Sequence, residues 1–290
     1  MNIVELYCRV DDFCKEFMPE YEKRLLANGN KLIETDSLNM SEIITIMINF
    51  HIEGYRDFKN YYKRHVCNVL KWAFPRLVSY NRFVELEKTA MVPLVSFLYS
   101  MRGRETGIYF VDSTALEVCH IKRAKWNKTF KGLAAKSKST MGWFYGFKLH
   151  LVCNDKGEIM NFSISKGNVD DRTPVRNLAK DLQGSLVGDR GYIDFKLFED
   201  LMAKGLKLIT KIKTNMKNKL MPLIDKILLR KRSIIETIND QLKNIYQIEH
   251  TRHRSPINFL VNLFSGLAAY SLSPKKPSLN FKINHLLVNQ

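Results

Sequence analysis

The sequence predicts an α/β fold, in which helices flank a mixed sheet, preceded by an all-helical N-terminal part. Three observations predict it. Apolar residues recur at three-to-four spacing through the first hundred residues, short apolar or alternating segments begin at Gly107, and strands and helices are interspersed after that point. The change of pattern divides the chain into a helical part, an α/β part and a tail: residues 1–104, 105–272 and 273–290.

Helix signals are clear in the N-terminal part. An amphipathic helix is expected from Ile3, and Asn39 with Glu42 has the spacing of a capping box that opens a helix through Phe50. Two further helices are expected over 58–73 and 79–101, joined by a short turn that contains a proline. This pair is either a helix-turn-helix that binds DNA or an ordinary pair of packed helices.

The α/β part contains five predicted strands. Two of them face each other across an Asn-Asp-Lys-Gly turn and predict a hairpin. Helices are expected between and after the strands, the last of them in an approximate helical phase that continues to Ile245. The strands are expected at 108–111, 147–153, 158–165, 185–188 and 206–213, and the helices at 173–182, 195–203 and 224–245.

The net charge is strongly positive and localised. The chain has 290 residues, 46 Lys and Arg, 29 Asp and Glu and a formal net charge of +17. Residues 113–150 contain eight basic residues and one acid, and residues 204–254 contain thirteen basic residues and four acids. A concentrated excess of this kind favours nucleic acid as the partner, although a merely solvated surface is the alternative. The hydrophobic content of 45% excludes global disorder.

Cysteine usage and hydropathy exclude other classes. The five cysteines are scattered and contain no Cys-x-x-Cys pair, so neither a disulfide framework nor a cysteine zinc site is expected, and a reducing compartment fits. The least polar stretch, 256–272, contains two asparagines and predicts a buried helix instead of a membrane span.

Three acidic residues carry the chemistry that the sequence suggests. Asp112 is expected at the end of the first strand, Asp189 at the end of the fourth and Glu236 on the last helix, and strand ends are where α/β folds bind ligands. Carboxylates hold Mg²⁺, and a pair of such ions promotes in-line phosphoryl displacement. Each acid also has a structural alternative. Asp112 and Asp189 can serve turns, and Glu236 can form a capping box with Ser233 or a surface pair with Arg232.

The residues around these acids resemble a known family. The spacing of Arg232, Glu236 and Lys243, with three and then six residues between them, resembles the glutamate motif of bacterial insertion-sequence transposases of the DDE class. That motif begins with a tyrosine, and Leu229 occupies the tyrosine position here. Other segments resemble the insertion-sequence family numbered nine-eighty-two. The matching residues are Phe110 to Thr114, Gly146 to His150, Asp189 to Tyr192, Arg232, Glu236 and Lys243, and Arg252 to Ser255.

The resemblance implies an RNase H-like catalytic core with a five-stranded mixed sheet. It implies that Asp112, Asp189 and Glu236 bind two Mg²⁺ ions, for which Mn²⁺ can substitute. Duplex DNA, as terminal inverted repeats and as target, is the implied partner of a cytoplasmic, nucleoid-associated homodimer that binds no membrane. The implied DNA contacts are Arg232, Lys243, Arg190 and Lys148.

The sequence leaves two rival functions open, and it leaves the role of two tryptophans open. The rivals are a metal-dependent nuclease without strand transfer and a DNA-binding protein without catalysis. Trp126 and Trp143 flank a basic stretch and either stack on bases or pack in the core, and core packing is the expectation.

Overall fold

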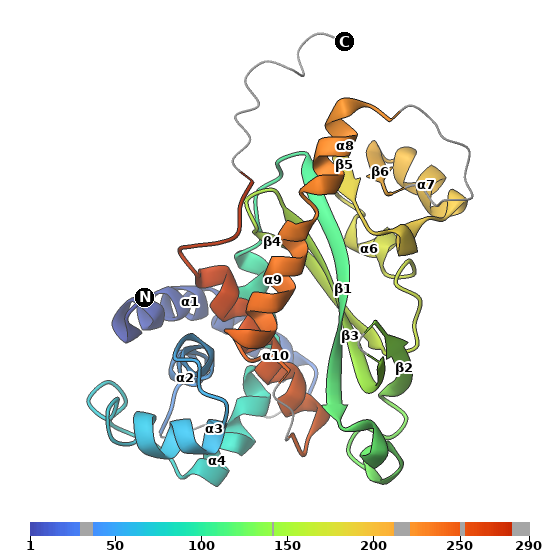
Figure 1. The fold of residues 1–290 in the computed structure, drawn as a ribbon. Helices are drawn as coiled ribbons and strands as arrows, with labels where there is room; N and C mark the ends of the chain where they lie inside the picture. Colours follow the sequence, from blue (N-terminus) through green and yellow to red (C-terminus); the bar gives the residue numbers. More distant parts are fainter. Residues whose placement is uncertain (30–36, 141, 212–220, 250–252, 280–290) are drawn as a thin grey trace. The chain divides into compact units, whose positions relative to one another are not determined.

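The computed structural model describes residues 1–29, 37–140, 142–211, 221–249 and 253–279, which form a mixed α/β structure (Figure 1). The chain divides into two compact units, each built from segments that are distant in sequence. Unit 1 consists of Met1–Arg102, Glu117–Gly146 and Asp240–Ser273, and unit 2 of Gly103–Leu116, Phe147–Asn239 and Pro274–Gln290.

Unit 1 is mainly helical. The expected capping box is confirmed, because the Asn39 side chain accepts from the Glu42 N–H while the Glu42 carboxylate accepts from the Asn39 N–H. The apolar stretch at the C-terminal end is a buried helix, as expected, and it packs against α2 and α5. The α-helices of unit 1 are α1 (Ile3–Ala27), α2 (Met40–Ile52), α3 (Phe58–Asn60), α4 (Tyr80–Leu86), α5 (Met91–Ser100) and α10 (Pro256–Leu272).

The helix expected over 58–73 is wrong beyond its first turns. A π-helical segment, Tyr61–Val66, follows α3, and turns continue to Ala73. Tyr61 and Tyr62 are both fully buried although they are consecutive, and successive residues of a regular α-helix point about 100° apart. The wider π turn places both rings among the aromatic side chains of this unit. The second predicted helix is also interrupted, by a 3₁₀ turn at Glu87–Ala90 between α4 and α5.

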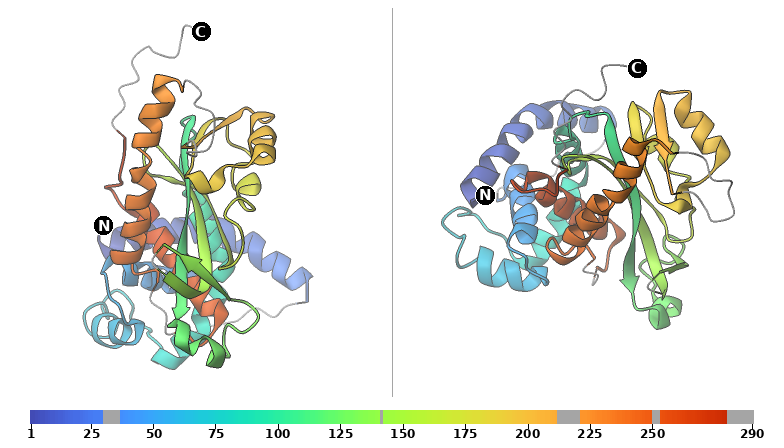
Figure 2. Two further views of the ribbon diagram at one scale, coloured as in Figure 1. Left: turned by 45° about the vertical axis from the view of Figure 1, so that its right-hand side comes forward. Right: turned by 45° about the horizontal axis from the view of Figure 1, so that its top comes forward.

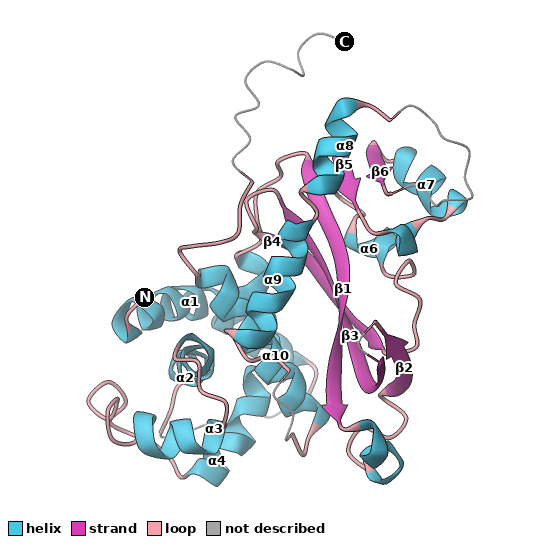
Figure 3. Ribbon diagram, viewed as in Figure 1, coloured by secondary structure: helices cyan, strands magenta, loops and turns pink. Residues whose placement is uncertain are grey.

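Over the part of the chain that the structure describes, the sheet has six strands, and the expectation of five is wrong. Figure 3 shows the strands in magenta. The strand order is β2-β3-β1-β5-β6, and β4 pairs with β3. β1, β5 and β6 are parallel, whereas β3 is antiparallel to β2 and to β4, so the expected hairpin is confirmed. The strands are β1 (Ile108–Cys119), β2 (Ala135–Ser139), β3 (Gly142–Asn154), β4 (Ile159–Lys166), β5 (Gly184–Val187) and β6 (Leu206–Ile209).

Two corrections concern individual strands: β2 was not predicted, and β1 is longer than predicted. The missed strand β2 reads Ala-Lys-Ser-Lys-Ser and lies at the end of the strand order, where lysines replace an apolar pattern because one edge has no partner strand. β1 is much longer than expected and continues past Asp112 to Cys119. Its second half alternates, with Leu116 and Val118 buried, a period-two pattern that identifies a strand.

The core of unit 2 lies on one face of the sheet. Tyr109 and Val111 of β1 face this core, together with apolar residues of α6 (Val175–Leu178) and α7 (Phe195–Met202). Side chains alternate along a strand, so Phe110 and Asp112 face the opposite side. Figures 1 and 2 show α6 and α7 on one side of β1 and β5 and the first turns of α9 on the other.

The long helix expected over 224–245 is broken. It consists of α8 (Leu223–Arg230) and α9 (Ser233–Asn244), separated by Lys231 and Arg232. The helix expected over 173–182 is likewise reduced to the single turn of α6. Among the described residues, no helix has both the length and the apolar character needed to cross a bilayer.

Candidate active site

Asp112 and Asp189 follow paired positions on neighbouring parallel strands. β1 and β5 pair as Ile108 with Ser185, Tyr109 with Leu186 and Phe110 with Val187. Asp112 lies two residues beyond Phe110, and Asp189 lies two residues beyond Val187. The two strands are therefore neighbours, and both acids follow the pairing at the same edge of the strands.

A glycine allows the backbones of the two strands to approach closely where their pairing begins. Gly184 has φ +113°, in the region that favours glycine, and a Cβ added there would lie 2.2 Å from the carbonyl oxygen of Gly107. The Ser185 N–H donates to that carbonyl at 2.8 Å. The absence of a side chain at Gly184 thus permits the pairing that aligns the two acids.

A residue of α9 contacts Asp112 directly. Asn239 Nδ2 donates to Asp112 Oδ2 at 3.3 Å, although the two residues are 127 positions apart. Asn239 lies three residues after Glu236, about one helical turn along α9. This contact therefore brings the part of α9 that bears Glu236 to the face of β1 that bears Asp112. The sequence analysis does not single out Asn239, and the only sequence signal for it is its i, i+3 spacing from Glu236.

The electrostatics of Asp112 link the three acids. Burial raises the pKa of this carboxyl to about 6, the Ser113 backbone N–H and the Arg232 guanidinium lower it, and the negative charges of Glu236 and Asp189 raise it further. A raised pKa means that the ionised form is short of compensating positive charge. Asp112 is thus a partly buried carboxyl whose acidic neighbours are the two other predicted site residues.

Glu236 forms an ion pair with Arg232, one turn earlier in the chain. The Arg232 side chain is only 16% exposed, whereas that of Glu236 is 53% exposed. This is the i, i+4 pair that the sequence allowed. The capping-box alternative has no support, because Ser233 is already helical and the hydrogen bonds of the described residues include none between its hydroxyl and the Glu236 N–H.

A basic pocket adjoins Glu236. Its volume is 410 Å³, and it opens to solvent between the end of β6 and the junction of α8 with α9. Four cations and one carboxylate line it, a composition that suits the oxygens of a phosphate group. The lining residues are Lys211, Lys226, Leu229, Arg230, Arg232, Ser233 and Glu236. Arg190 is exposed as well and directly follows Asp189.

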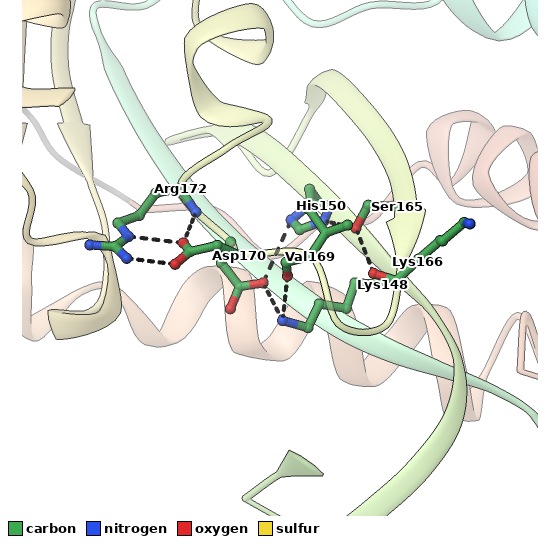
Figure 4. A network of polar contacts seen from close by, with 8 residues as sticks. Lys148, His150, Ser165, Lys166, Val169, Asp170 and Arg172 are labelled. Atoms are coloured by element: carbon green, nitrogen blue, oxygen red, sulfur yellow. Dashed lines mark hydrogen bonds and ion pairs between the residues drawn. The ribbon is translucent and has the colours of Figure 1, made fainter. Parts of the chain in front are cut away.

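Lys148 is held by neighbouring groups instead of pointing freely into solvent (Figure 4). Its Nζ donates to Asp171 Oδ1 at 2.9 Å and to the Val169 carbonyl at 3.0 Å. His150, on the same strand, lies with Nε2 2.7 Å from Ser165 Oγ, and burial lowers its pKa to about 4. Lys148 thereby fixes the loop that follows β4, a role that the sequence did not indicate.

Asp171 connects this network to the acids through Tyr192. Burial raises the pKa of the Tyr192 hydroxyl, and the charges of Asp112, Asp171 and Asp189 raise it further. Asp171 of the Lys148 network and the two site acids Asp112 and Asp189 are therefore neighbours around one buried tyrosine. Lys243, the remaining predicted DNA contact, belongs to unit 1 and pairs there with Glu249 at 3.1 Å.

The acids are electrostatic neighbours whose oxygen atoms are of the type that metals bind, but in this structure their side chains do not converge on one ion position. Over residues 1–29, 37–140, 142–211, 221–249 and 253–279, no three His, Cys, Asp or Glu side chains are placed to hold one ion. The arrangement instead combines clustered carboxylates with adjacent cations, a combination that is typical of sites acting on phosphodiesters.

Comparison with known proteins agrees with this chemistry. A family described as "Transposase DDE domain" matches residues 102–256. A solved structure of a piggyBac transposase synaptic complex with hairpin DNA is similar over 92% of this chain and 71% of that chain, with 10% sequence identity and a TM-score of 0.49. No curated protein matches significantly. More than half of the chain thus fits one family, and the protein belongs to the DDE transposases.

Proposed function

We propose that this transposase cuts the ends of a bacterial insertion sequence and joins the resulting 3′-hydroxyls to target DNA, as the resemblance to the family numbered nine-eighty-two implies. The observation that carries the proposal is the grouping of Asp112, Asp189 and Glu236. Two of these acids follow paired positions of β1 and β5, and the Asn239–Asp112 contact draws in the helix that bears the third. The strand order supports an RNase H-like core.

The residues present fit divalent ions. Carboxylate oxygens are the ligands that hard cations prefer, and the raised pKa of Asp112 marks a place where added positive charge is stabilising. Asn239 Oδ1 is a buried amide oxygen without a hydrogen-bond partner among the described residues, and it lies beside this carboxyl. Asp112, Asp189 and Glu236 would hold two Mg²⁺ ions, or Mn²⁺ in their place. Such ions activate the attacking oxygen and stabilise the leaving oxygen.

The neighbouring cations position the DNA strand. Arg232 pairs with Glu236 and also lowers the pKa of Asp112, so it is a cation close to two of the acids and the first candidate for a phosphate contact. The other cations of the basic pocket extend this contact along the backbone, where each neutralised phosphate releases counterions. Arg190 and Lys243 would contact further phosphates, and Lys148 would act mainly by holding the 166–172 loop in place.

The rest of the chain supplies recognition. We assign the helices of residues 1–104 to the terminal inverted repeats and residues 105–272 to the chemistry, with 273–290 as a tail. Because an element has two ends, the active complex would be a homodimer, and it would act on the nucleoid in the cytoplasm.

The test uses full-length protein and a duplex that carries an element end, taken from the DNA flanking the gene. With Mg²⁺, the transposase should nick this end and produce joined products with a target duplex. Nicks without joined products would identify a nuclease. DNA binding without either product would identify a non-catalytic DNA-binding protein, and Asp112→Asn serves as the inactive control.

A further inference from the structure

All three tryptophans of the chain are exposed. Trp72, Trp126 and Trp143 show 67%, 75% and 63% of their surface to solvent, so the expectation that Trp126 and Trp143 pack in the core is wrong. Large aromatic side chains usually contribute most to burial, so two exposed tryptophans in one short segment point to a ligand. Trp126 and Trp143 belong to one segment of unit 1, residues 120–140 with 142–143, which we call the basic arm.

Secondary structure and one buried aromatic side chain hold the basic arm in place. It contains a 3₁₀ turn, Ile121–Trp126, and the antiparallel pair of β2 with the start of β3. Phe130 anchors it, because its side chain is buried and packs edge-on against Phe259. The backbone carbonyl of Phe130 also accepts a hydrogen bond from the Tyr145 hydroxyl at 3.1 Å. The exposed tryptophans therefore project from an ordered scaffold, which reduces the entropy lost when a ligand binds.

The charge of the basic arm has one sign. It contains seven cations and no acid, all seven are exposed, and none forms an ion pair with another residue that the structure describes. Lys138 lies directly across the strand pair from Trp143, so a cation and an aromatic face are neighbours on one side of the hairpin. The cations are Lys122, Arg123, Lys125, Lys128, Lys131, Lys136 and Lys138.

We propose that the basic arm binds DNA that carries unpaired bases, with Trp126 and Trp143 as stacking platforms and the lysines as phosphate contacts. Exposed aromatics interleaved with cations are the combination that recognises single strands, because every base presents a face for stacking. Fully paired duplex would use the cations and leave the tryptophans without a partner. The inference rests on the proposed function only in taking DNA as the substrate, and it adds a preference for frayed or single-stranded ends.

The measurement is a binding titration of the full chain in EDTA with two probes of one sequence: a blunt duplex, and the same duplex with a single-stranded overhang. Trp126→Ala and Trp143→Ala should each weaken binding of the overhang probe by about tenfold, the size of one lost base stack, and change blunt binding by less than about twofold. Quenching of tryptophan fluorescence by the overhang should fall in parallel. Phe195→Ala, an equally exposed aromatic on α7, should change neither probe.

A second pair of variants separates charge from stacking. Lys136→Gln with Lys138→Gln should lower the slope of log affinity against log salt by about two for both probes, because two phosphate contacts are lost. Equal losses on blunt and overhang DNA in the tryptophan variants would overturn the stacking role. Loss of a dimer in sedimentation, with DNA binding unchanged, would identify the surface as an interface between two copies and overturn the proposal.

The outcome is independent of the catalytic assignment. Asp112→Asn, which disables the proposed chemistry, should leave the preference for overhang DNA unchanged. If no metal-dependent cleavage exists but the preference persists and depends on both tryptophans, then the proposed function fails while the inference stands.

Discussion

Removing the charge of Asp112 should stabilise the metal-free protein. Burial and the two neighbouring carboxylates raise the pKa of Asp112 from 3.8 to about 6. One pKa unit corresponds to about 1.4 kcal/mol, so the ionised form costs at most about 3 kcal/mol of folding free energy. Asn is nearly isosteric with Asp, and its Oδ1 can still accept from Asn239 Nδ2. Asp112→Asn should therefore increase the free energy of unfolding by about 2–3 kcal/mol at pH 8.

The stability difference between Asp112→Asn and wild type should depend on pH in a definite direction. Because the folded pKa is raised, the folded state binds more protons than the unfolded state between about pH 4 and pH 6. The stability of the wild-type protein therefore falls as the pH rises through this window and stays at its reduced value above it. The difference between Asp112→Asn and wild type should be small at pH 4, about half of its full size at pH 5 and near its full size above pH 6.

Urea unfolding in EDTA at pH 5 and pH 8 measures this difference. Asp225→Asn is the matched control, because Asp225 is buried but accepts from Lys207 Nζ at 2.7 Å, and its removal leaves that cation without its partner. The control should lose stability where Asp112→Asn gains it. A destabilised Asp112→Asn at pH 8 would refute the reasoning, since it would mean that the carboxylate is already compensated.

The remaining predictions concern other parts of the molecule. Burial raises the pKa of Glu87 from 4.5 to about 8, so wild-type stability should also fall between about pH 4.5 and pH 8. Glu87→Gln should be more stable than wild type above pH 8 by at most about 5 kcal/mol, and equal stability there in denaturant titrations would contradict this. Gly184→Ala should cost about 2 kcal/mol or more in thermal unfolding because its Cβ meets the Gly107 carbonyl, whereas Gly191→Ala, with open space, should cost much less. Affinity for duplex DNA should fall linearly on a log–log plot against salt, and a flat dependence would remove DNA as the reason for the charge of +17.

Local signals were the part of the fold that sequence could predict. The Asn39 capping box, the β3–β4 hairpin and the apolar helix α10 each follow from residues within one short segment. These features depend on periodicity and turn chemistry, which a sequence displays directly.

Features set by distant contacts escaped prediction. β2 has no apolar pattern because it lies at the sheet edge, and α10 packs with α2 and α5, more than 150 residues earlier in the chain. The contact of Asn239 with Asp112 depends on the break before α9, which sets the rotation of that helix. The pairing of Lys148 with Asp171 likewise depends on the path of the loop after β4. No periodicity in the sequence encodes these choices.

The most direct test of the central claim is Mg²⁺-dependent cleavage of an end-bearing duplex by Asp112→Asn, Asp189→Asn, Glu236→Gln and the triple variant. Three carboxylates that act as one site should each be indispensable, so every single variant should lose cleavage about as completely as the triple, while DNA affinity and folding persist. Glu236→Gln is the decisive member, because its partner Arg232 allows a purely structural role. Cleavage by Glu236→Gln at near the wild-type rate would contradict the account and direct the search to Asp240, the next acid along α9.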